Sequence, residues 1–505
     1  MKNKYDVVII GSGLGGLVSA NILARHGYRV CVVEKNKQYG GNLQTFVRDK
    51  NIFDTGVHYI GSLGEGENLH QYFKYLGIMD SLKISKLDMD RFDLITFGND
   101  HIKYPHGQGY DNFSKLLIQK FPKEEKAILT YCKKLQEVCK SFPLYNLETN
   151  EIGYNNDYLT ISISDYLDSI TENEKLKAVL AGSNFLYAGT RHTPLYVHAL
   201  SVNSYIISSW RCTDGGSQIT RLLMSKIKEY GGDFYNRQEV VGFKMKDDSI
   251  VSVITKKGNE IEADLFVSNI EPKLTVKMLE GKGVRKSYLN RINQIKSMIS
   301  VFSMYIVFKP KSFKYINHNN YHFKNYQSVW ETQEYSQSSW PESYMLSMGT
   351  KKNQDEWSSN LTAMAYMNFD EVEKWEESYN TVSNEFDRGK EYEDFKKNKV
   401  DLFINELENK FPDIRKHIQS IHSSTPLSYR DYIGSHRGAI YGYEKDAANP
   451  MMTFLSPKTK IKNLFLTGQS VNMHGILGVT ISGFLTCTHI LGKEKLMKSL
   501  KETLD

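Results

Sequence analysis

Residues 5–16 read YDVVIIGSGLGG, a short apolar run that leads directly into a glycine-rich turn. The β-branched residues of the run predict a buried strand, and the apolar spacing of residues 17–27 (LVSANILARHG) predicts a helix after the turn. A second predicted strand, residues 28–35 (YRVCVVEK), brings in Glu34 near its end. Strand, turn, helix and strand in this order predict a βαβ unit.

The turn has the G-x-G-x-x-G spacing of a dinucleotide-binding fingerprint. Gly11 permits the tight turn, Gly13 lets the backbone approach a pyrophosphate, and Gly16 lets the helix pack closely on the strand. The pyrophosphate would lie at the amino terminus of the helix, where unpaired N–H groups favour negative charge. Glu34, about 20 residues further on, can accept hydrogen bonds from ribose hydroxyls and repels a 2′-phosphate, which argues against NADP. A glycine turn without a ligand is the weaker alternative.

Length and composition are those of a globular protein with two domains. The chain has 505 residues, of which 40% are hydrophobic and 24% charged, and its net charge of +6 is too mild and too dispersed to indicate a nucleic-acid partner. No apolar run approaches the roughly 18–20 residues that a bilayer span needs. The amino-terminal run meets the glycine turn without a cleavage site, so we expect a cytoplasmic protein. The five cysteines show neither a metal-ligand spacing nor a disulfide framework, and we expect no metal.

Beyond Glu34, residues 40–45 (GGNLQT) bring a second glycine pair, and residues 53–61 (FDTGVHYIG) follow as an extended segment. This arrangement resembles the extended fingerprint of FAD enzymes of the amine oxidase and carotenoid desaturase superfamily. Residues 211–232 (RCTDGGSQITRLLMSKIKEYGG) and 463–491 (NLFLTGQSVNMHGILGVTISGFLTCTHIL) resemble the later parts of the same site. The resemblance implies that FAD is the cofactor.

By the same resemblance, Val240 lies against the adenine, Gly468 and Gln469 meet the pyrophosphate or ribityl chain, and Gly478-Val479-Thr480 opens a helix toward the flavin. The residues implied to contact FAD are Gly11, Ser12, Gly13, Leu14, Gly15, Gly16, Glu34, Lys35, Gly40, Gly41, Asn42, Thr45, His58, Val240, Asn269, Gly468, Gln469, Gly478, Val479 and Thr480.

The whole chain resembles one branch of this superfamily, which contains the phytoene desaturases, the carotenoid cis–trans isomerases and the all-trans-retinol 13,14-reductases (retinol saturases). The segments that carry the resemblance are FDTGVHYIG (53–61), FPKEEKAILTYCKKL (121–135), HALSVNSYIISSW (198–210) and TPLSYRDYIGSHRGAIYGYEKD (425–446). The last segment implies that Arg430, Tyr432, Arg437 and Tyr441 form the substrate-side wall, although solvated or ion-paired side chains are the favoured alternative for Arg430 and Arg437. Residues 470–474 (SVNMH) depart from the saturase pattern, so we do not expect the substrate to be inherited unchanged.

His58, Tyr59 and His474 are the candidate catalytic side chains, because the resemblance implies that they lie beside the flavin ring. Packing residues that fix the loops are the alternative for all three. The many aromatic residues between Tyr315 and Tyr344 suit either a polyene tunnel or an ordinary sheet face.

The resemblance implies an α/β protein with a discontinuous Rossmann-like FAD-binding domain of the glutathione-reductase-like type, built from residues 1–70, 205–275 and 455–505. The substrate domain would be α+β, with a helical insertion at 100–205 and a mixed sheet at 280–450. The sequence contains one dinucleotide fingerprint, so we expect an external electron donor or acceptor.

The expected function is an FAD-dependent oxidation or reduction of a C=C bond in a long apolar conjugated lipid, similar to a retinoid or carotenoid. Saturation is favoured, with cis–trans isomerisation or phytoene-type desaturation as the alternatives. An amine oxidase, or a carrier of prenyl lipids that resembles the GDP-dissociation inhibitors and performs no redox chemistry, is a further alternative. The basic amphipathic tail, residues 491–505 (LGKEKLMKSLKETLD), permits peripheral contact with a membrane, although a solvated closing helix explains it as well.

Overall fold

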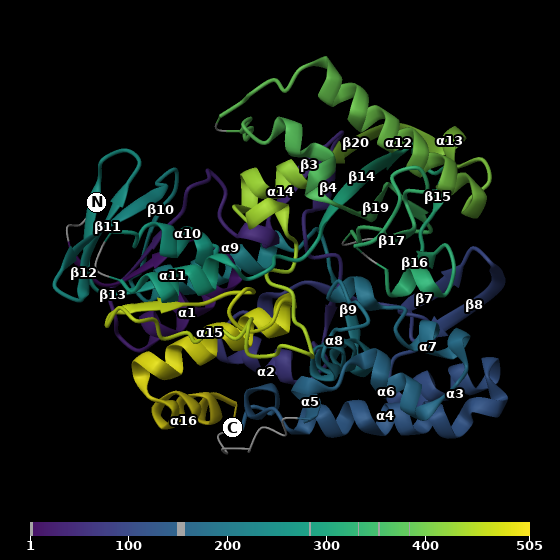
Figure 1. Ribbon diagram of the computed structural model, residues 1–505, viewed down its shortest axis with the longest axis horizontal. Helices are drawn as coiled ribbons and strands as arrows, with labels where there is room; N and C mark the ends of the chain where they lie inside the picture. The colour runs from purple at the N-terminus through teal and green to yellow at the C-terminus, as the bar shows by residue number, and fades with distance from the viewer. Residues whose placement is uncertain are drawn as a thin grey trace.

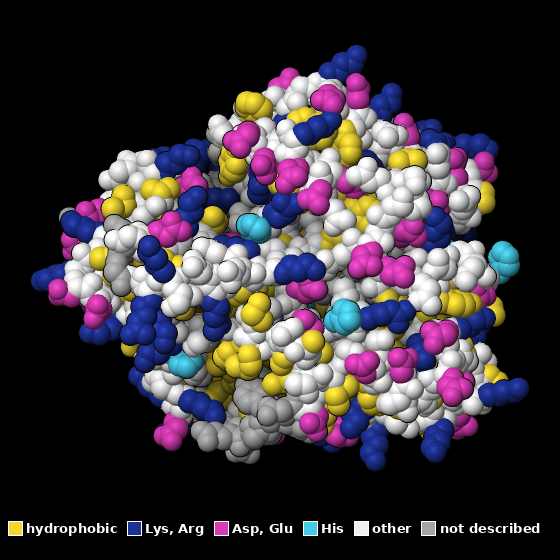
Figure 2. All heavy atoms as spheres, in the orientation of Figure 1, with side chains coloured by type: hydrophobic (Ala, Val, Ile, Leu, Met, Phe, Trp, Pro, Cys, Tyr) yellow, Lys and Arg dark blue, Asp and Glu magenta, His cyan; other side chains and the backbone are white. Residues whose placement is uncertain are grey.

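The computed structural model describes residues 4–148, 157–281, 284–331, 333–351, 354–382 and 384–504. Two large sheets and a helical layer form the molecule. In Figure 1 the first sheet lies on the left, the second at the upper right and the helical layer at the lower right. Figure 2 shows basic and acidic side chains mixed over the same face, so neither charge gathers there.

The first sheet has a parallel core with the order β10-β2-β1-β13-β21. Its strands are β1 (Lys4–Ile10), β2 (Val30–Val33), β10 (Asp233–Tyr235), β13 (Glu260–Ser268) and β21 (Leu464–Leu466). The antiparallel strands β11 (Val240–Lys246) and β12 (Ser249–Thr255) join it at the start of β13. Strands from both ends of the chain are therefore neighbours of β13, and the predicted α/β fold with a Rossmann-like sheet is confirmed.

Three helices pack beside this sheet: α1 (Leu14–Arg25), α9 (Ser217–Glu229) and α15 (Gly475–Leu491). α1 contacts both of the others. A Cβ on Gly483 of α15 would lie 2.6 Å from Val18 Cγ1 of α1, so the absence of a side chain at Gly483 allows this close approach. The tail forms α16 (Lys493–Leu504), which buries Leu496, Met497 and Leu500 against α15 and α2 (Asn68–Tyr75).

The second sheet has the order β20-β14-β19-β17-β16-β7-β8. Its strands are β7 (Asp93–Phe97), β8 (Asp100–His106), β14 (Ser300–Phe308), β16 (Asn319–Phe323), β17 (Ser343–Ser347), β19 (Asn360–Met367) and β20 (Ile418–Ser424). All pairs are antiparallel except β16 with β7. Every residue of β14 and β19 is buried, because α12 (Lys390–Lys410) packs Phe403, Ile404 and Leu407 on one face and the rest of the molecule covers the other.

The helical layer lies between residues 110 and 207. Its helices are α3 (Tyr110–Lys120), α4 (Glu125–Lys140), α5 (Asp157–Thr160), α6 (Ile163–Ile170), α7 (Glu174–Leu180) and α8 (Leu195–Ile207). α4 packs on α8, burying residues at the three- and four-residue spacing of a helix face, including Ile128, Cys132 and Leu135. A small sheet, in the order β5 (Ile60–Gly61), β9 (Ser209–Cys212), β6 (Ile84–Lys86), connects this layer to the first sheet.

The remaining elements are short connectors. They are β3 (Thr45–Arg48), β4 (Asn51–Asp54), α10 (Pro272–Lys277), α11 (Lys286–Asn293), β15 (Phe313–Lys314), β18 (Trp357–Ser358), α13 (Ile414–His417) and α14 (Pro426–Ile433). Among the described residues, no helix combines the length and the apolar composition that crossing a membrane would require.

Candidate active site

A cavity of about 670 Å³ begins at the amino-terminal glycine turn and continues to the second sheet. Its lining includes Gly11 from the turn, Gly468 after β21, and Tyr321 from β16. Elements of both sheets therefore enclose one continuous space, which is the usual position of a ligand site in a molecule built from two domains.

The glycine turn is as compact as its sequence predicts. Gly11 has a φ of +89°, a conformation that residues with side chains rarely adopt. A Cβ on Gly16 would lie 2.4 Å from the carbonyl oxygen of Gly11, so only glycine lets α1 start this close to β1. A Cβ on Gly13 would lie 2.7 Å from Asn269 Nδ2 at the end of β13. The bare backbone thus leaves the amino terminus of α1 open toward the cavity.

Segments far apart in the sequence meet at this turn. A Cβ on Gly15 would lie 2.9 Å from the backbone nitrogen of Gly468, which directly links the turn to the segment after β21. Gly13 also forms an isolated bridge with Gly40, and a Cβ on Gly41 would lie 3.1 Å from Gly13 Cα. The second glycine pair of the sequence therefore packs on the first.

Glu34 lies buried at the end of β2 and faces the same turn. Its Oε2 accepts hydrogen bonds from the backbone nitrogen of Ser12 at 3.0 Å and from Ser12 Oγ at 2.6 Å, and its Oε1 accepts one from the backbone nitrogen of Asn36 at 2.8 Å. A carboxylate oxygen can accept about two hydrogen bonds, so Oε2 is fully used and Oε1 keeps capacity for a ribose hydroxyl. The neighbouring ammonium group of Lys35 donates to the carbonyl oxygen of Asp431 at 2.9 Å, and burial lowers the pKa of Lys35.

Sixteen of the residues that the resemblance implies for FAD line this cavity. They are Gly11, Ser12, Gly13, Leu14, Gly15, Glu34, Lys35, Gly40, Gly41, Asn42, His58, Val240, Asn269, Gly468, Gln469 and Val479. Four others are positioned differently: Gly16 packs on Gly11, Thr45 donates a hydrogen bond to Ser217, and Gly478 and Thr480 lie inside the first turns of α15. From α15 the cavity is lined instead by Gly475 and Ile476 in addition to Val479.

The far end of the cavity is aromatic and apolar. It is lined by Phe185, Tyr205, Tyr321, Met345, Met364 and Tyr429. These residues come from the helical layer, the second sheet and α14, and the sequence interpretation assigned none of them individually. The aromatic stretch between Tyr315 and Tyr344 divides between two roles, since Tyr321 lines the cavity and Trp340 packs against Phe302 and Phe403 in the core.

The three candidate catalytic residues have different surroundings. His58 lines the cavity and also a small adjoining one, and burial, with the charge of Arg211 as a second cause, lowers the pKa of His58 to about 4. Tyr59 lines the cavity too, and its hydroxyl donates to Asp93 Oδ2 at 2.9 Å. His474 lies behind the lining at the start of α15, 4.9 Å from the ring of Tyr441, and burial lowers the pKa of His474 to about 3.

Both histidines are therefore neutral at pH 7. The Nε2 atoms of His58 and His474 are buried without a hydrogen-bond partner among the residues that the structure describes. An unpartnered polar atom at the wall of a cavity is what a bound polar group would satisfy. His58 is the one of the two that faces the cavity.

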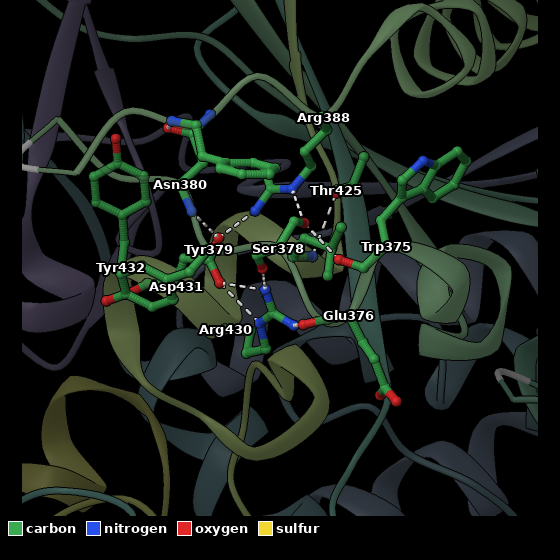
Figure 3. Close-up of polar contacts among 12 residues, drawn as sticks. Trp375, Glu376, Ser378, Tyr379, Asn380, Arg388, Thr425, Arg430, Asp431 and Tyr432 are labelled. Atoms are coloured by element: carbon green, nitrogen blue, oxygen red, sulfur yellow. Dashed lines mark hydrogen bonds and ion pairs between the residues drawn. The ribbon is translucent and has the colours of Figure 1, made fainter.

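Figure 3 shows the polar contacts of Arg430, which is not among the residues that line the cavity. The guanidinium group of Arg430 contacts Asp431 and the carbonyl oxygens of Glu376 and Ser378, while Arg388 approaches Asp431 from the other side. Asp431 is fully buried and is the centre of this cluster. The cluster attaches the segment before α12 to α14. The contacts of Arg430 therefore have a structural role.

The other predicted wall residues divide in the same way. Tyr432 and Tyr441 line the cavity, and the hydroxyl of Tyr441 donates to the carbonyl oxygen of Phe185. The guanidinium group of Arg437 is partly exposed, pairs with Asp370 and Glu373, and lies 4.8 Å from the ring of Phe369. Its place in the substrate wall stays a prediction of the resemblance.

The residues present fit a dinucleotide. The turn that a Cβ at Gly13 or Gly16 would fill opens at the amino terminus of a 12-residue helix, where the first N–H groups have no intrahelical partner. Glu34 supplies an acceptor for a ribose, and Val240 and Val241 line the same cavity. The site therefore has a cradle for the pyrophosphate, a ribose acceptor and an apolar surface for a base.

Comparisons with known proteins agree with this geometry. Residues 9–76 match the model of the NAD(P)-binding Rossmann-like domain. The chain is 28% identical to the all-trans-retinol 13,14-reductase of Rattus norvegicus, over 99% of this chain and 87% of the relative, and 23% identical to prolycopene isomerase 2 of an Oncidium hybrid cultivar, over 96% and 83%. The cyclohexylamine oxidase of Brevibacterium oxydans shares the fold with a TM-score of 0.63 at 15% identity, over 99% of both chains.

These relatives confirm the resemblance to the branch of retinol reductases and carotenoid isomerases. The relatives are enzymes, a reductase and an isomerase, and this agrees with the expectation that the chain is an enzyme.

Proposed function

We propose that this relative of the retinol 13,14-reductases and prolycopene isomerases is an FAD-dependent oxidoreductase that acts on a C=C bond of a long, apolar, conjugated lipid, in the saturating direction. One observation carries the proposal. A single cavity has a dinucleotide cradle at one end and an aromatic, methionine-rich wall at the other. A redox cofactor held at the first end would meet an apolar substrate held at the second.

The wall of the far end suits a polyene. Phe185 and Tyr321 contribute aromatic rings to the lining, and Met345 and Met364 supply flexible thioethers that adapt to an apolar chain. The acidic residues that line the cavity, Glu34, Glu239 and Glu271, all come from the first sheet or its flanking segments. The far end thus offers hydrophobic contact and phenol hydroxyls, which supports a lipid substrate over a cationic amine.

Bound FAD would supply hydride transfer to or from carbon. The residues of this chain hold and orient it: the turn from Gly11 to Gly16 and the amino terminus of α1 bind the pyrophosphate, and Glu34 binds a ribose. The amino terminus of α15 directs unpaired N–H groups at negative charge that develops beside it. The aromatic far end excludes water and holds the polyene in place, which lowers the entropic part of the barrier.

Desaturation and cis–trans isomerisation use the same site, so they are the first alternatives. A non-redox carrier of prenyl lipids would need the apolar end alone, and the complete cradle around Gly11, Glu34 and Gly468 argues against it. The sequence contains a single dinucleotide fingerprint, so we further propose that an external electron donor or acceptor completes the cycle and that contact with a membrane supplies the lipid.

The test is anaerobic photoreduction of the purified protein, followed by a panel of retinoids, carotenes and polyenoic lipids with products resolved by mass. A gain of two hydrogens supports the saturase, a loss of two from the oxidised protein identifies a desaturase, and an unchanged mass with altered retention identifies an isomerase. A colourless protein that releases no flavin on denaturation would contradict the proposal and favour the carrier.

A further inference from the structure

A chain of buried hydroxyl and carboxyl groups leads away from the apolar end of the cavity. The hydroxyl of Tyr59 donates to Asp93 Oδ2 at 2.9 Å and lies 2.7 Å from the hydroxyl of Tyr321. Tyr59 and Tyr321 line the cavity, whereas Asp93, at the start of β7, lies behind them and is fully buried. The three groups connect the interior of the protein to the space proposed for the substrate.

Two other neighbours of Asp93 can donate hydrogen bonds to the oxygens of its carboxyl group. Asn319 Nδ2 donates to Asp93 Oδ1 at 2.9 Å, and Ser183 Oγ donates to Asp93 Oδ2 at 3.1 Å. Arg211 Nη2 donates to Asn319 Oδ1 at 2.7 Å, so a buried positive charge lies one residue away from the carboxyl group. Tyr205, whose ring centroid lies 4.5 Å from that of Tyr59, also faces this group from α8.

His106 on β8 favours a proton on Asp93. His106 Nε2 lies 3.1 Å from the carbonyl oxygen of Val179, which can only accept, so Nε2 carries the hydrogen. Burial lowers the pKa of His106 to about 4, so at pH 7 the ring is neutral and Nδ1 is an acceptor for Ser183 Oγ at 3.2 Å. Ser183 has one hydrogen and cannot donate to both His106 and Asp93. When Ser183 donates to His106, Asp93 loses one of the donors that stabilise its carboxylate, which favours the protonated acid.

The acidities agree with this assignment. Burial raises the pKa of Asp93 to about 7, against the opposing effects of Asn319, Tyr59, Ser183 and Arg211. Burial also raises the pKa values of Tyr59 and Tyr321 well above the ordinary value. In the neutral range Asp93 can therefore hold or release a proton, and the two phenols stay protonated and pass it on.

The direction of proton transfer follows from the positions of the hydroxyl hydrogens. When Asp93 is protonated and donates to Tyr59, the hydrogen of Tyr59 turns to the oxygen of Tyr321. Among the described residues, Tyr59 is the one hydrogen-bond partner of the Tyr321 hydroxyl, so the hydrogen of Tyr321 is then free to point into the cavity. All three hydrogens align from the interior toward the substrate.

We propose that Asp93, Tyr59 and Tyr321 form the proton relay of the reaction, with Tyr321 as the group that protonates the substrate carbon. This inference rests on the proposed function. Reduction of a C=C bond adds a hydride, with its electron pair, to one carbon from the reduced flavin and a proton to the other carbon. Tyr321 gives its proton to the substrate and receives the proton of Tyr59, which in turn receives the proton of Asp93. Asp93 ends as a carboxylate stabilised by Asn319 and Ser183.

The balance is complete without another reactant. One π bond is lost, two C–H bonds form, the flavin is oxidised by two electrons, and Asp93 loses one proton that solvent later restores. In the reverse direction the same groups accept the proton. An isomerisation leaves Asp93 with the proton it began with, so the relay distinguishes the alternatives for the function.

The experiment measures single turnover of the photoreduced enzyme with the polyene that reacts in the panel. Tyr321→Phe and Tyr59→Phe are expected to slow proton delivery by about 10²- to 10⁴-fold, the usual effect of removing a general acid. Both should retain flavin and photoreduce normally. The matched control is Tyr366→Phe, another buried phenol, which lies outside the lining and has no hydrogen-bond partner for its hydroxyl among the described residues. It should react as the unmodified protein does.

A second measurement does not depend on turnover. Infrared difference spectroscopy in H₂O and D₂O should show the carbonyl band of a buried carboxylic acid that titrates with a midpoint near the Asp93 pKa of about 7. Asp93→Asn should remove this band. The single-turnover rate of the unmodified protein should fall above that pH, and the rate of the variant should not depend on pH there. Asp54 is another buried carboxyl whose pKa is raised to about 7, so if Asp93→Asn does not fold, the titration is measured in Asp54→Asn, and this band and the two phenylalanine variants still decide.

The outcomes separate the two proposals. Phenylalanine variants that react as fast as the unmodified protein, or an unmodified protein without a titrating carboxylic acid band, would overturn the relay. An unmodified protein that alters no polyene would overturn the proposed function, and the infrared titration would then be the test of the proton on Asp93.

Discussion

Ser12 Oγ donates a hydrogen bond to Glu34 Oε2 at 2.6 Å, which joins the glycine turn after β1 to the end of β2. The contact makes Glu34 a structural part of the turn, in addition to the ribose acceptor that we propose it to be. We predict that Glu34→Arg abolishes retention of FAD, because it removes the acceptor of Ser12 and places a long cation where the acid was buried. The measurement is the ratio of flavin to protein absorbance after gel filtration.

Glu262→Arg is the matched control for that substitution. It reverses a charge on β13, two strands from β2 in the same sheet, at an exposed position outside the cavity lining. It should retain flavin. Retention of stoichiometric FAD by Glu34→Arg would show that the turn binds the dinucleotide without the acid.

We predict that His58→Ala leaves FAD bound. Burial lowers the pKa of His58 to about 4, so the ring carries no charge at pH 7 that a phosphate could use, and the glycine turn and Glu34 supply the nucleotide contacts independently. The flavin content should match that of the unmodified protein, and the pH dependence of turnover above pH 6 should not change. If the substitution strips the cofactor, the loop from Phe53 to Gly61 contributes directly to the binding of FAD.

Asp54 predicts a pH dependence of stability. Its carboxyl group accepts a hydrogen bond from the backbone nitrogen of Gly216 at 2.7 Å, and burial raises the pKa of Asp54 from 3.8 to about 7. The folded protein therefore binds one proton more than the unfolded chain between these two values. The stability that this proton confers is complete below the unfolded pKa and is lost as the pH rises toward 7, at up to about 1.4 kcal/mol per pH unit.

Asp54→Asn should remove this component. The free energy of unfolding in urea, measured from acid to neutral pH, should fall less steeply with pH in the variant, and the two proteins should differ most on the alkaline side. Asp264→Asn, at an exposed position on β13, is the control and should preserve the slope. An unchanged slope in Asp54→Asn would mean that this carboxyl titrates at its ordinary value in the folded protein.

The cluster around Asp431 predicts a large loss of stability. Asp431 is fully buried between Arg388 and Arg430 and also accepts from the backbone nitrogen of Asn380 at 2.9 Å. Asp431→Ala leaves two guanidinium groups without their common partner, so we expect a loss of about 3–5 kcal/mol, as for other broken buried pairs. Urea unfolding measures it.

Asp370→Ala supplies the comparison, since it breaks a solvent-exposed pair with Arg437. Exposed pairs are screened by water and contribute little, so its midpoint of unfolding should stay close to that of the unmodified protein. Equal losses in the two variants would indicate that the network in Figure 3 adds nothing beyond a surface pair.

The nucleotide end of the site was predictable because its signals are local. The spacing of Gly11, Gly13 and Gly16, and the acid at Glu34, are set within a single βαβ unit, and each lies where the spacing predicts. The second glycine pair at Gly40 was also identified from the sequence. The family resemblance extended the prediction to Gly468 and Gln469, more than 400 residues away, and these line the same cavity.

The far end was not predictable in this way, because long-range strand pairing creates it. Tyr321 pairs with Ile95 in the parallel contact between β16 and β7, and Asp93 pairs with Asn319 in the same register. No local periodicity in either segment indicates that contact. Arg430 lies in the segment that carries the most specific resemblance, and its side chain pairs with the buried carboxylate of Asp431, which agrees with the ion-paired alternative to a place in the substrate wall.

The neighbours of β13 have a consequence for biosynthesis. β1 lies on one side of this strand and β21 on the other, although about nine-tenths of the chain separates them. When a ribosome has released the amino-terminal half of the chain, β1 is therefore available to pair with β13 and β21 is not. The pairing that completes the sheet waits until the last fifty residues emerge. Capture of the nucleotide is consequently a late event, and a premature stop before Leu464 would yield a chain that has its fingerprint but cannot close around the ligand.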